Sequence, residues 1–114
     1  MAFQIAITED AERQLRSLPV RERRILEAAI LSRLQQQPTT PTNAIKRLTP
    51  NPLAEFELRA GLLRALYNVE GDEVVILIVG RKVGNKLIVE GEEFHGHQDH
   101  SIEPPANGPA EDAE

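Results

Sequence analysis

Six basic side chains occupy positions where they could bind phosphate, in or beside segments rich in leucine and β-branched residues. Guanidinium and ammonium groups bind phosphate oxygens, and they stabilise negative charge that develops in a transition state. We therefore treat these positions as candidate contacts to a nucleic acid or another polyanion. They are Lys46, Arg47, Arg59, Arg64, Arg81 and Lys82.

Each of these residues also has a purely structural interpretation. Arg64 could pair across a hairpin with Glu55 or Glu57, because opposite charges on neighbouring strands attract. Arg59 could stabilise the turn at Gly61, where a positive φ or a bulge is expected. The two basic pairs could be solvated segments or could together line one basic groove.

Composition sets limits on the class of protein. The chain has 114 residues and a mass of 12.7 kDa, so we expect one small domain and exclude a two-domain enzyme. The absence of cysteine excludes a disulfide framework, a thiolate zinc site and a cysteine nucleophile. No apolar run approaches the ~20 residues that a membrane span requires, so we expect a cytoplasmic protein with no membrane partner.

The charge of the chain is unevenly distributed. The formal net charge is −5, yet residues 90–114 carry eight acidic and no basic residues, which leaves the rest of the chain with a charge of +3. We predict a domain over residues 1–94 and a disordered acidic tail over residues 95–114. The tail holds a possible metal-ligand cluster, but nothing in it would orient the rings, so we expect neither metal nor cofactor; the cluster is His95, His97, Asp99 and His100.

Hydrophobic periodicity predicts an α+β fold. Alternation predicts a strand over residues 3–7, and Thr8 is a suitable N-cap for a helix that ends before Pro19. A second amphipathic helix is expected from Val20 to about Gln36, followed by an irregular proline-rich connection over residues 37–52. Strands are expected near residues 54–58, 62–69, 74–79 and 86–89, with short turns that require antiparallel pairing. The prediction is an N-terminal strand and a two-helix hairpin packed on a three- to four-stranded antiparallel twisted sheet.

Two segments, taken in order, resemble the RelE/ParE superfamily of bacterial toxins. Members typically show Leu-Arg-x-Gly-x-x-Arg-x-x-Tyr on a hairpin, then a β-branched strand that ends in a basic pair. Here the first segment is Leu58-Arg59-Ala60-Gly61-Leu62-Leu63-Arg64-Ala65-Leu66-Tyr67, and the second is Val74-Val75-Ile76-Leu77-Ile78-Val79-Gly80-Arg81-Lys82. The segment Ile45-Lys46-Arg47-Leu48 is similar to a third family element, and the resemblance extends over residues 3–89.

The resemblance implies the toxin of a type II toxin-antitoxin pair. Such a toxin binds an antitoxin protein along its helical hairpin and sheet edge. The first activity we expect is inhibition of translation by ribosome-dependent, metal-independent cleavage of mRNA, and the second is inhibition of DNA gyrase. Under the first activity, Arg64 is implied to contact the scissile phosphate, with Arg81 and Lys82 beside it. Lys46, Arg47 and Arg59 would then bind RNA.

This chain departs from the family pattern at two places, and both departures favour a function other than strong mRNA cleavage. Strongly active endonuclease members carry lysines where this chain has Glu55 and Glu57, and a carboxylate there would repel phosphate. The late tyrosine is also missing, because residues 87–89 are Leu, Ile and Val. The alternatives are a gyrase inhibitor, a weak nuclease with one of these glutamates as base, and a degenerate module that only binds antitoxin. Tyr67 itself is expected in the core with a hydrogen-bonded hydroxyl.

Overall fold

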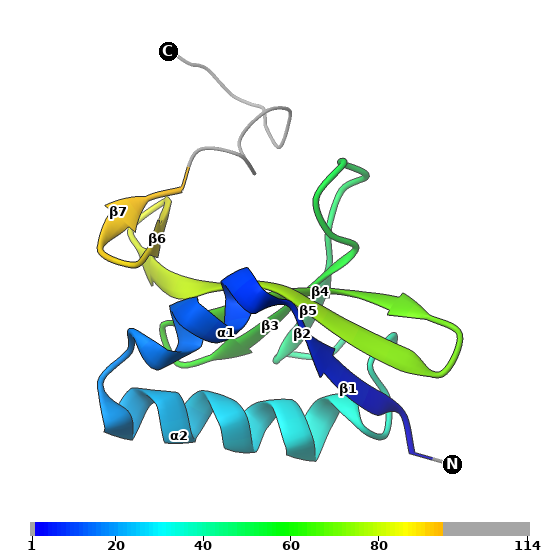
Figure 1. Cartoon of the computed structure of the whole chain (residues 1–114). Coiled ribbons are helices and arrows are strands. Elements are labelled where there is room, and N and C mark those ends of the chain that lie inside the picture. The colour runs from blue at the N-terminus through cyan, green and yellow to red at the C-terminus, as the bar shows by residue number, and fades with distance from the viewer. Residues whose placement is uncertain (1, 95–114) are drawn as a thin grey trace.

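One mixed β-sheet, covered on one face by two helices, makes up the part of the chain that the computed structural model describes, residues 2–94 (Figure 1). The two helices are α1 (Glu9–Arg16) and α2 (Val20–Ala29), and α2 continues as a π-helical turn over Ile30–Leu34. No helix among these residues is long and apolar enough to cross a membrane. The strands are β1 (Gln4–Ile7), β2 (Ile45–Arg47), β3 (Phe56–Ala60), β4 (Leu63–Glu70), β5 (Glu73–Val83), β6 (Lys86–Val89) and β7 (Glu92–Glu93).

The expected antiparallel meander is confirmed, and the sheet is larger than predicted. Strands β2 to β7 follow one another in sequence order, each antiparallel to the next. Strand β1 instead runs parallel to the first half of β5, with Gln4 beside Glu73 and Ile7 beside Ile76. The α+β class with an N-terminal strand and a helical hairpin is therefore correct, with the sheet extended to seven strands.

Strand β2 corrects the expectation of an irregular connection over residues 37–52. Its neighbours bond to β3 through the main chain: Arg59 N–H donates to Ala44 O at 2.7 Å, and Leu48 N–H donates to Glu55 O at 2.8 Å. Prolines on both sides of the segment predict a loop, whereas the strand forms because one edge of β3 is available to pair with it. As a result, Lys46 and Arg47 lie on a strand, and their side chains project from opposite faces of the sheet.

The helix boundaries follow from local chemistry. Thr8 caps α1 as predicted, because its Oγ1 accepts from Ala11 N–H at 3.1 Å. Pro19 precedes α2, where a proline fits the first turn of a helix. The second helix was expected to reach about Gln36, and helical structure ends at Leu34.

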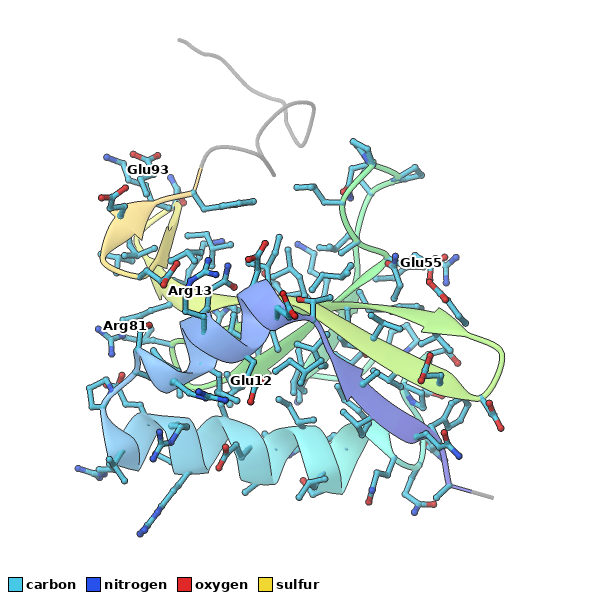
Figure 2. The ribbon with its side chains drawn as sticks, viewed as in Figure 1. Glu12, Arg13, Glu55, Arg81 and Glu93 are labelled. Carbon is cyan, nitrogen blue, oxygen red and sulfur yellow. The ribbon has the colours of Figure 1, made fainter. Side chains whose placement is uncertain are left out.

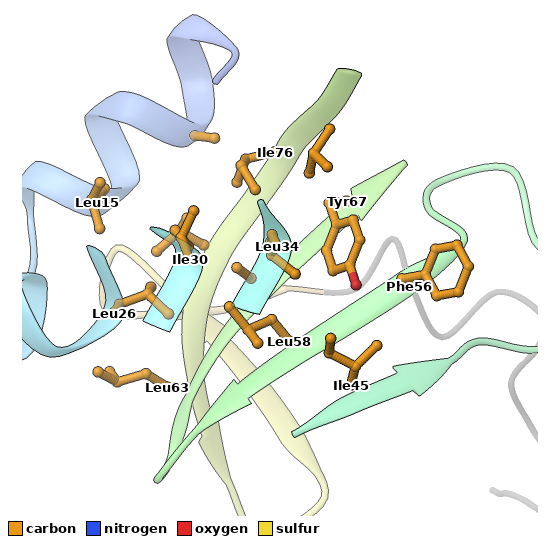
Figure 3. Packing of buried hydrophobic residues seen from close by; sticks show 14 residues of the cluster. Leu15, Leu26, Ile30, Leu34, Ile45, Phe56, Leu58, Leu63, Tyr67 and Ile76 are labelled. Atoms are coloured by element: carbon orange, nitrogen blue, oxygen red, sulfur yellow. The ribbon is translucent and has the colours of Figure 1, made fainter. Parts of the chain in front are cut away.

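The main core lies between the helices and the sheet (Figure 3). Tyr67 is fully buried there, as predicted, with its ring stacked on Phe56 at 5.4 Å between centroids. Its hydroxyl donates to Pro38 O at 2.5 Å, which attaches the connection after the π-helical turn to the centre of the sheet. The other fully buried large side chains of this core are Leu26, Leu34, Leu58, Ile76, Val74 and Val79.

A second, smaller cluster lies on the opposite face of the sheet, which we call the open face. The β2–β3 connection and the β6–β7 hairpin rise on this side, away from the helices (Figure 1). Their apolar side chains cover part of the face, which the hydrophobic periodicity of the sequence did not predict. The cluster consists of Ala54, Leu66, Ile78, Leu87 and Val89, with Leu48, Leu53, Leu77 and Phe94 packed around it.

Candidate anion-binding face of the sheet

Four of the six predicted basic residues share the open face, next to the second cluster. Register places them there, because residues directly opposite one another on neighbouring strands project from the same face. Lys46 is opposite Glu57, and Arg59 is opposite Arg64. Lys82 joins them on β5, opposite Leu87 of the second cluster. Strands β2 to β5 thus bring together four cations from distant parts of the sequence.

The other two predicted residues project toward the helix side. Arg47 is opposite Phe56, and its guanidinium carbon lies 5.2 Å from the centre of that ring. Arg81 forms an ion pair with Glu22 of α2, at the end of β5 near the helices (Figure 2). Each basic pair is therefore divided between the two faces, and the six residues do not line a single groove.

An irregularity in β5 decides which member of the second basic pair reaches the open face. The register between β4 and β5 shifts after Leu66, which is opposite Ile78, to Tyr67, which is opposite Ile76. The extra residue, Leu77, reverses the alternation of side chains along the rest of β5. If β5 instead alternated strictly from Ile76 onward, with no irregularity at Leu77, Arg81 and not Lys82 would project from the open face.

Arg64 is held by the protein itself. Its side chain is only 11% exposed, and one terminal nitrogen donates to Gly61 O at 2.7 Å and to Leu63 O at 2.9 Å. Its Nε is buried without a hydrogen bond and lies 4.0 Å from Glu57 Oε2. Burial lowers the pKa of Arg64, while the charge of Glu57 acts in the opposite direction. This arginine thus braces the β3–β4 turn, where Gly61 has the positive φ expected, 61°.

Glu57 is the acidic centre of the face. It is 6% exposed, and its Oε1 accepts from Arg59 Nε at 3.2 Å. Together with Arg64 these residues form a triad of two cations and one anion. Pairing of Arg64 with a glutamate was one of the structural interpretations offered by the sequence, and the geometry selects Glu57 for it.

Glu55 has a different role. Its side chain accepts from Val69 N–H at 3.3 Å, and its own N–H donates to the side-chain oxygen of Asn68 at 2.8 Å. The residue is exposed at the foot of the β2–β3 connection (Figure 2). It therefore helps to join this connection to β4 and takes no part in the triad.

A separate groove lies between the helices and β1. It has a volume of about 390 Å³, and Ile7 and Leu15 supply its apolar surface. Within residues 2–94, β1 pairs with β5 alone, so its other edge has no strand partner. The remaining lining residues are charged, three basic and two acidic: Glu12, Arg16, Arg23, Arg24 and Glu27.

Two predicted features lie outside the described residues. These are the acidic tail over residues 95–114 and the histidine cluster within it. Between residues 2 and 94, no group of three histidine, cysteine or acidic side chains is arranged to hold a metal ion. Where the family's late tyrosine was missing, β6 places Leu87 and Val89 in the second cluster, so that strand offers no titratable side chain to the face.

The helical hairpin on one face of this strand order is the fold of RelE-type toxin-antitoxin proteins, as the motif resemblance predicts. A chain in the crystal structure of the toxin-antitoxin complex RelBE2 from Mycobacterium tuberculosis is 26% identical, with a TM-score of 0.63 over 72% of this chain and 100% of that one. A chain of the archaeal RelE-RelB complex from Pyrococcus horikoshii OT3 is 20% identical, with a TM-score of 0.58 over 71% and 96%. No protein-family model and no curated protein matches the sequence.

Proposed function

We propose that this chain is the toxin of a type II toxin-antitoxin pair. The observation that carries the proposal is the likeness to the RelBE2 complex, which extends over that chain's full length at 26% identity. The order of the family motifs in the sequence supports it independently. The partner is then an antitoxin protein.

The groove between the helices and β1 is the proposed antitoxin site. Ile7 and Leu15 offer apolar surface beside the free edge of β1, which suits an amphipathic helix or an added strand. The charged rim would select the partner, since complementary charges act mainly on specificity and association rate.

The growth of a bacterial host, measured with and without a co-expressed antitoxin, tests this proposal. Induced expression of the wild-type chain should arrest a bacterial host, and co-expression of a candidate antitoxin should relieve the arrest. Ile7→Glu should weaken the complex because it buries a charge against the partner. Leu62→Glu is the matched control, since Leu62 is 63% exposed in the β3–β4 hairpin and outside the groove. Normal growth under wild-type expression would count against a toxin.

For the mode of action, we propose that the wild-type chain does not cut mRNA. Cleavage by the family mechanism needs Arg64 at the scissile phosphate, whereas here the Arg64 side chain is only 11% exposed, bound to two carbonyl groups and adjacent to Glu57. Glu57 is too buried to reach a ribose hydroxyl as a base. Gyrase inhibition is compatible with an engaged Arg64 and with growth arrest, whereas a role limited to antitoxin binding is compatible with an engaged Arg64 but would leave growth normal. A supercoiling assay with purified gyrase separates these two.

A further inference from the structure

The carboxylate of Glu57 occupies the point on the open face where two guanidinium groups converge. Arg59 reaches it from the same strand at 3.2 Å, and Arg64 approaches it from the neighbouring strand at 4.0 Å. An oxyanion held between two arginines is also the arrangement by which proteins bind phosphate. The site is therefore built like an anion site whose anion is part of the chain.

The carboxylate of Glu57 determines how much positive charge the triad presents to a phosphate. The triad carries a net charge of +1 with the carboxylate and +2 without it. Lys46, directly opposite Glu57, is exposed, and Lys82 is half-buried on the same face, so both can add to the attraction for a phosphate.

Burial keeps Glu57 in place. Glu57 is 6% exposed. Its strand, β3, lies between β2 and β4, whose residues Lys46 and Leu66 are directly opposite it. Moving it into solvent would leave Arg64 Nε buried with neither a hydrogen bond nor a nearby counter-charge, which is costly. An external phosphate must compete with a carboxylate that is already in position.

We propose that Glu57 is an internal anion that fills the phosphate position of the open face, so that this single carboxylate prevents the face from binding RNA phosphates. The inference deepens the proposed function by naming the residue that keeps Arg64 from a substrate. It concerns binding by the isolated chain, so its test does not depend on an antitoxin or on growth arrest.

The first test compares two variants with the same change in net charge. Glu57→Gln should bind a short single-stranded RNA about tenfold more tightly than wild type at low salt, because it removes the negative charge that two guanidinium groups now face. Glu55→Gln, altered on an exposed residue outside the triad, should change the affinity much less. Adding Arg64→Ala to Glu57→Gln should remove most of the gain. Equal effects of the two glutamine variants would overturn the proposal, since net charge alone would then explain the result.

A second test uses the wild-type chain and needs no variant to fold. The Nε–H resonance of Arg64 in a nitrogen-15 NMR spectrum reports directly on its engagement. Titration with inorganic pyrophosphate should leave this resonance unchanged while exposed arginines such as Arg21 shift. A shift of the Arg64 signal at the same pyrophosphate concentration would contradict the proposal. Growth arrest is scored separately, so failure here leaves the toxin proposal intact.

Discussion

Arg64 Nε and Glu57 Oε2 lie 4.0 Å apart on adjacent strands, both in side chains that are almost wholly buried. Arg64 also donates to two carbonyl oxygens of its own hairpin. The residue that the family motif assigns to the scissile phosphate is thus a structural brace of the β3–β4 turn. What the open face can bind depends on whether this arginine leaves Glu57.

A double-mutant cycle should show stronger coupling of Glu57 to Arg64 than to Arg59. The Arg59 side chain is 39% exposed, so solvent screens that pair, whereas the Arg64 side chain is 11% exposed. We expect a coupling of about 1 to 2 kcal/mol for the first pair and under about 1 kcal/mol for the second. Urea unfolding of the alanine variants measures both. Equal couplings would mean that burial does not distinguish the two arginines.

Tyr67→Phe should lower the free energy of unfolding by about 1 to 2 kcal/mol, because Pro38 O loses its donor inside the core. Ring packing on Phe56 is retained in this variant. Chemical denaturation near neutral pH provides the measurement. A variant as stable as wild type would show that the hydroxyl hydrogen bond contributes no net stability.

The same tyrosine should make stability fall at alkaline pH. Burial raises the pKa of Tyr67 because the phenolate would be desolvated. Its contribution is therefore complete below the unfolded-state pKa of about 10 and is lost as the pH rises toward the folded-state value. The stability difference between wild type and Tyr67→Phe should stay constant up to about pH 9 and shrink as the pH rises above about 10. A constant difference would contradict this linkage.

Gly80→Ala should destabilise the sheet at the junction of β5 and β6. A Cβ at this position would lie 2.5 Å from Ile88 O, so the backbone of β6 would have to move. We expect a loss of about 1 to 3 kcal/mol, typical of overpacking. Gly84→Asn is the control, because that turn has open space and asparagine tolerates its φ of 60°. An equal fall in the thermal unfolding temperature of the two variants would argue against the close contact between position 80 and Ile88 O.

The features that the sequence predicts correctly depend on residues close together in the chain, whereas the features that it does not predict depend on residues far apart in the chain. Local signals identified the Thr8 cap, the Gly61 turn and the buried Tyr67, since each depends on neighbouring residues. The face reached by Lys82 depends on the irregularity at Leu77, which no local pattern announces. The β2 pairing and the second core cluster likewise depend on contacts between distant segments. Strict alternation along a strand could have shown that adjacent basic residues diverge.

Primer extension on a defined mRNA in a cell-free translation reaction tests whether Arg64 can act on RNA while Glu57 is present. With the wild-type chain we predict intact mRNA, because Arg64 is engaged by Glu57 and the hairpin carbonyl groups. Arg64→Ala is assayed beside it. A ribosome-dependent cut by the wild type that Arg64→Ala abolishes would contradict this prediction and show that Arg64 reaches the scissile phosphate despite Glu57.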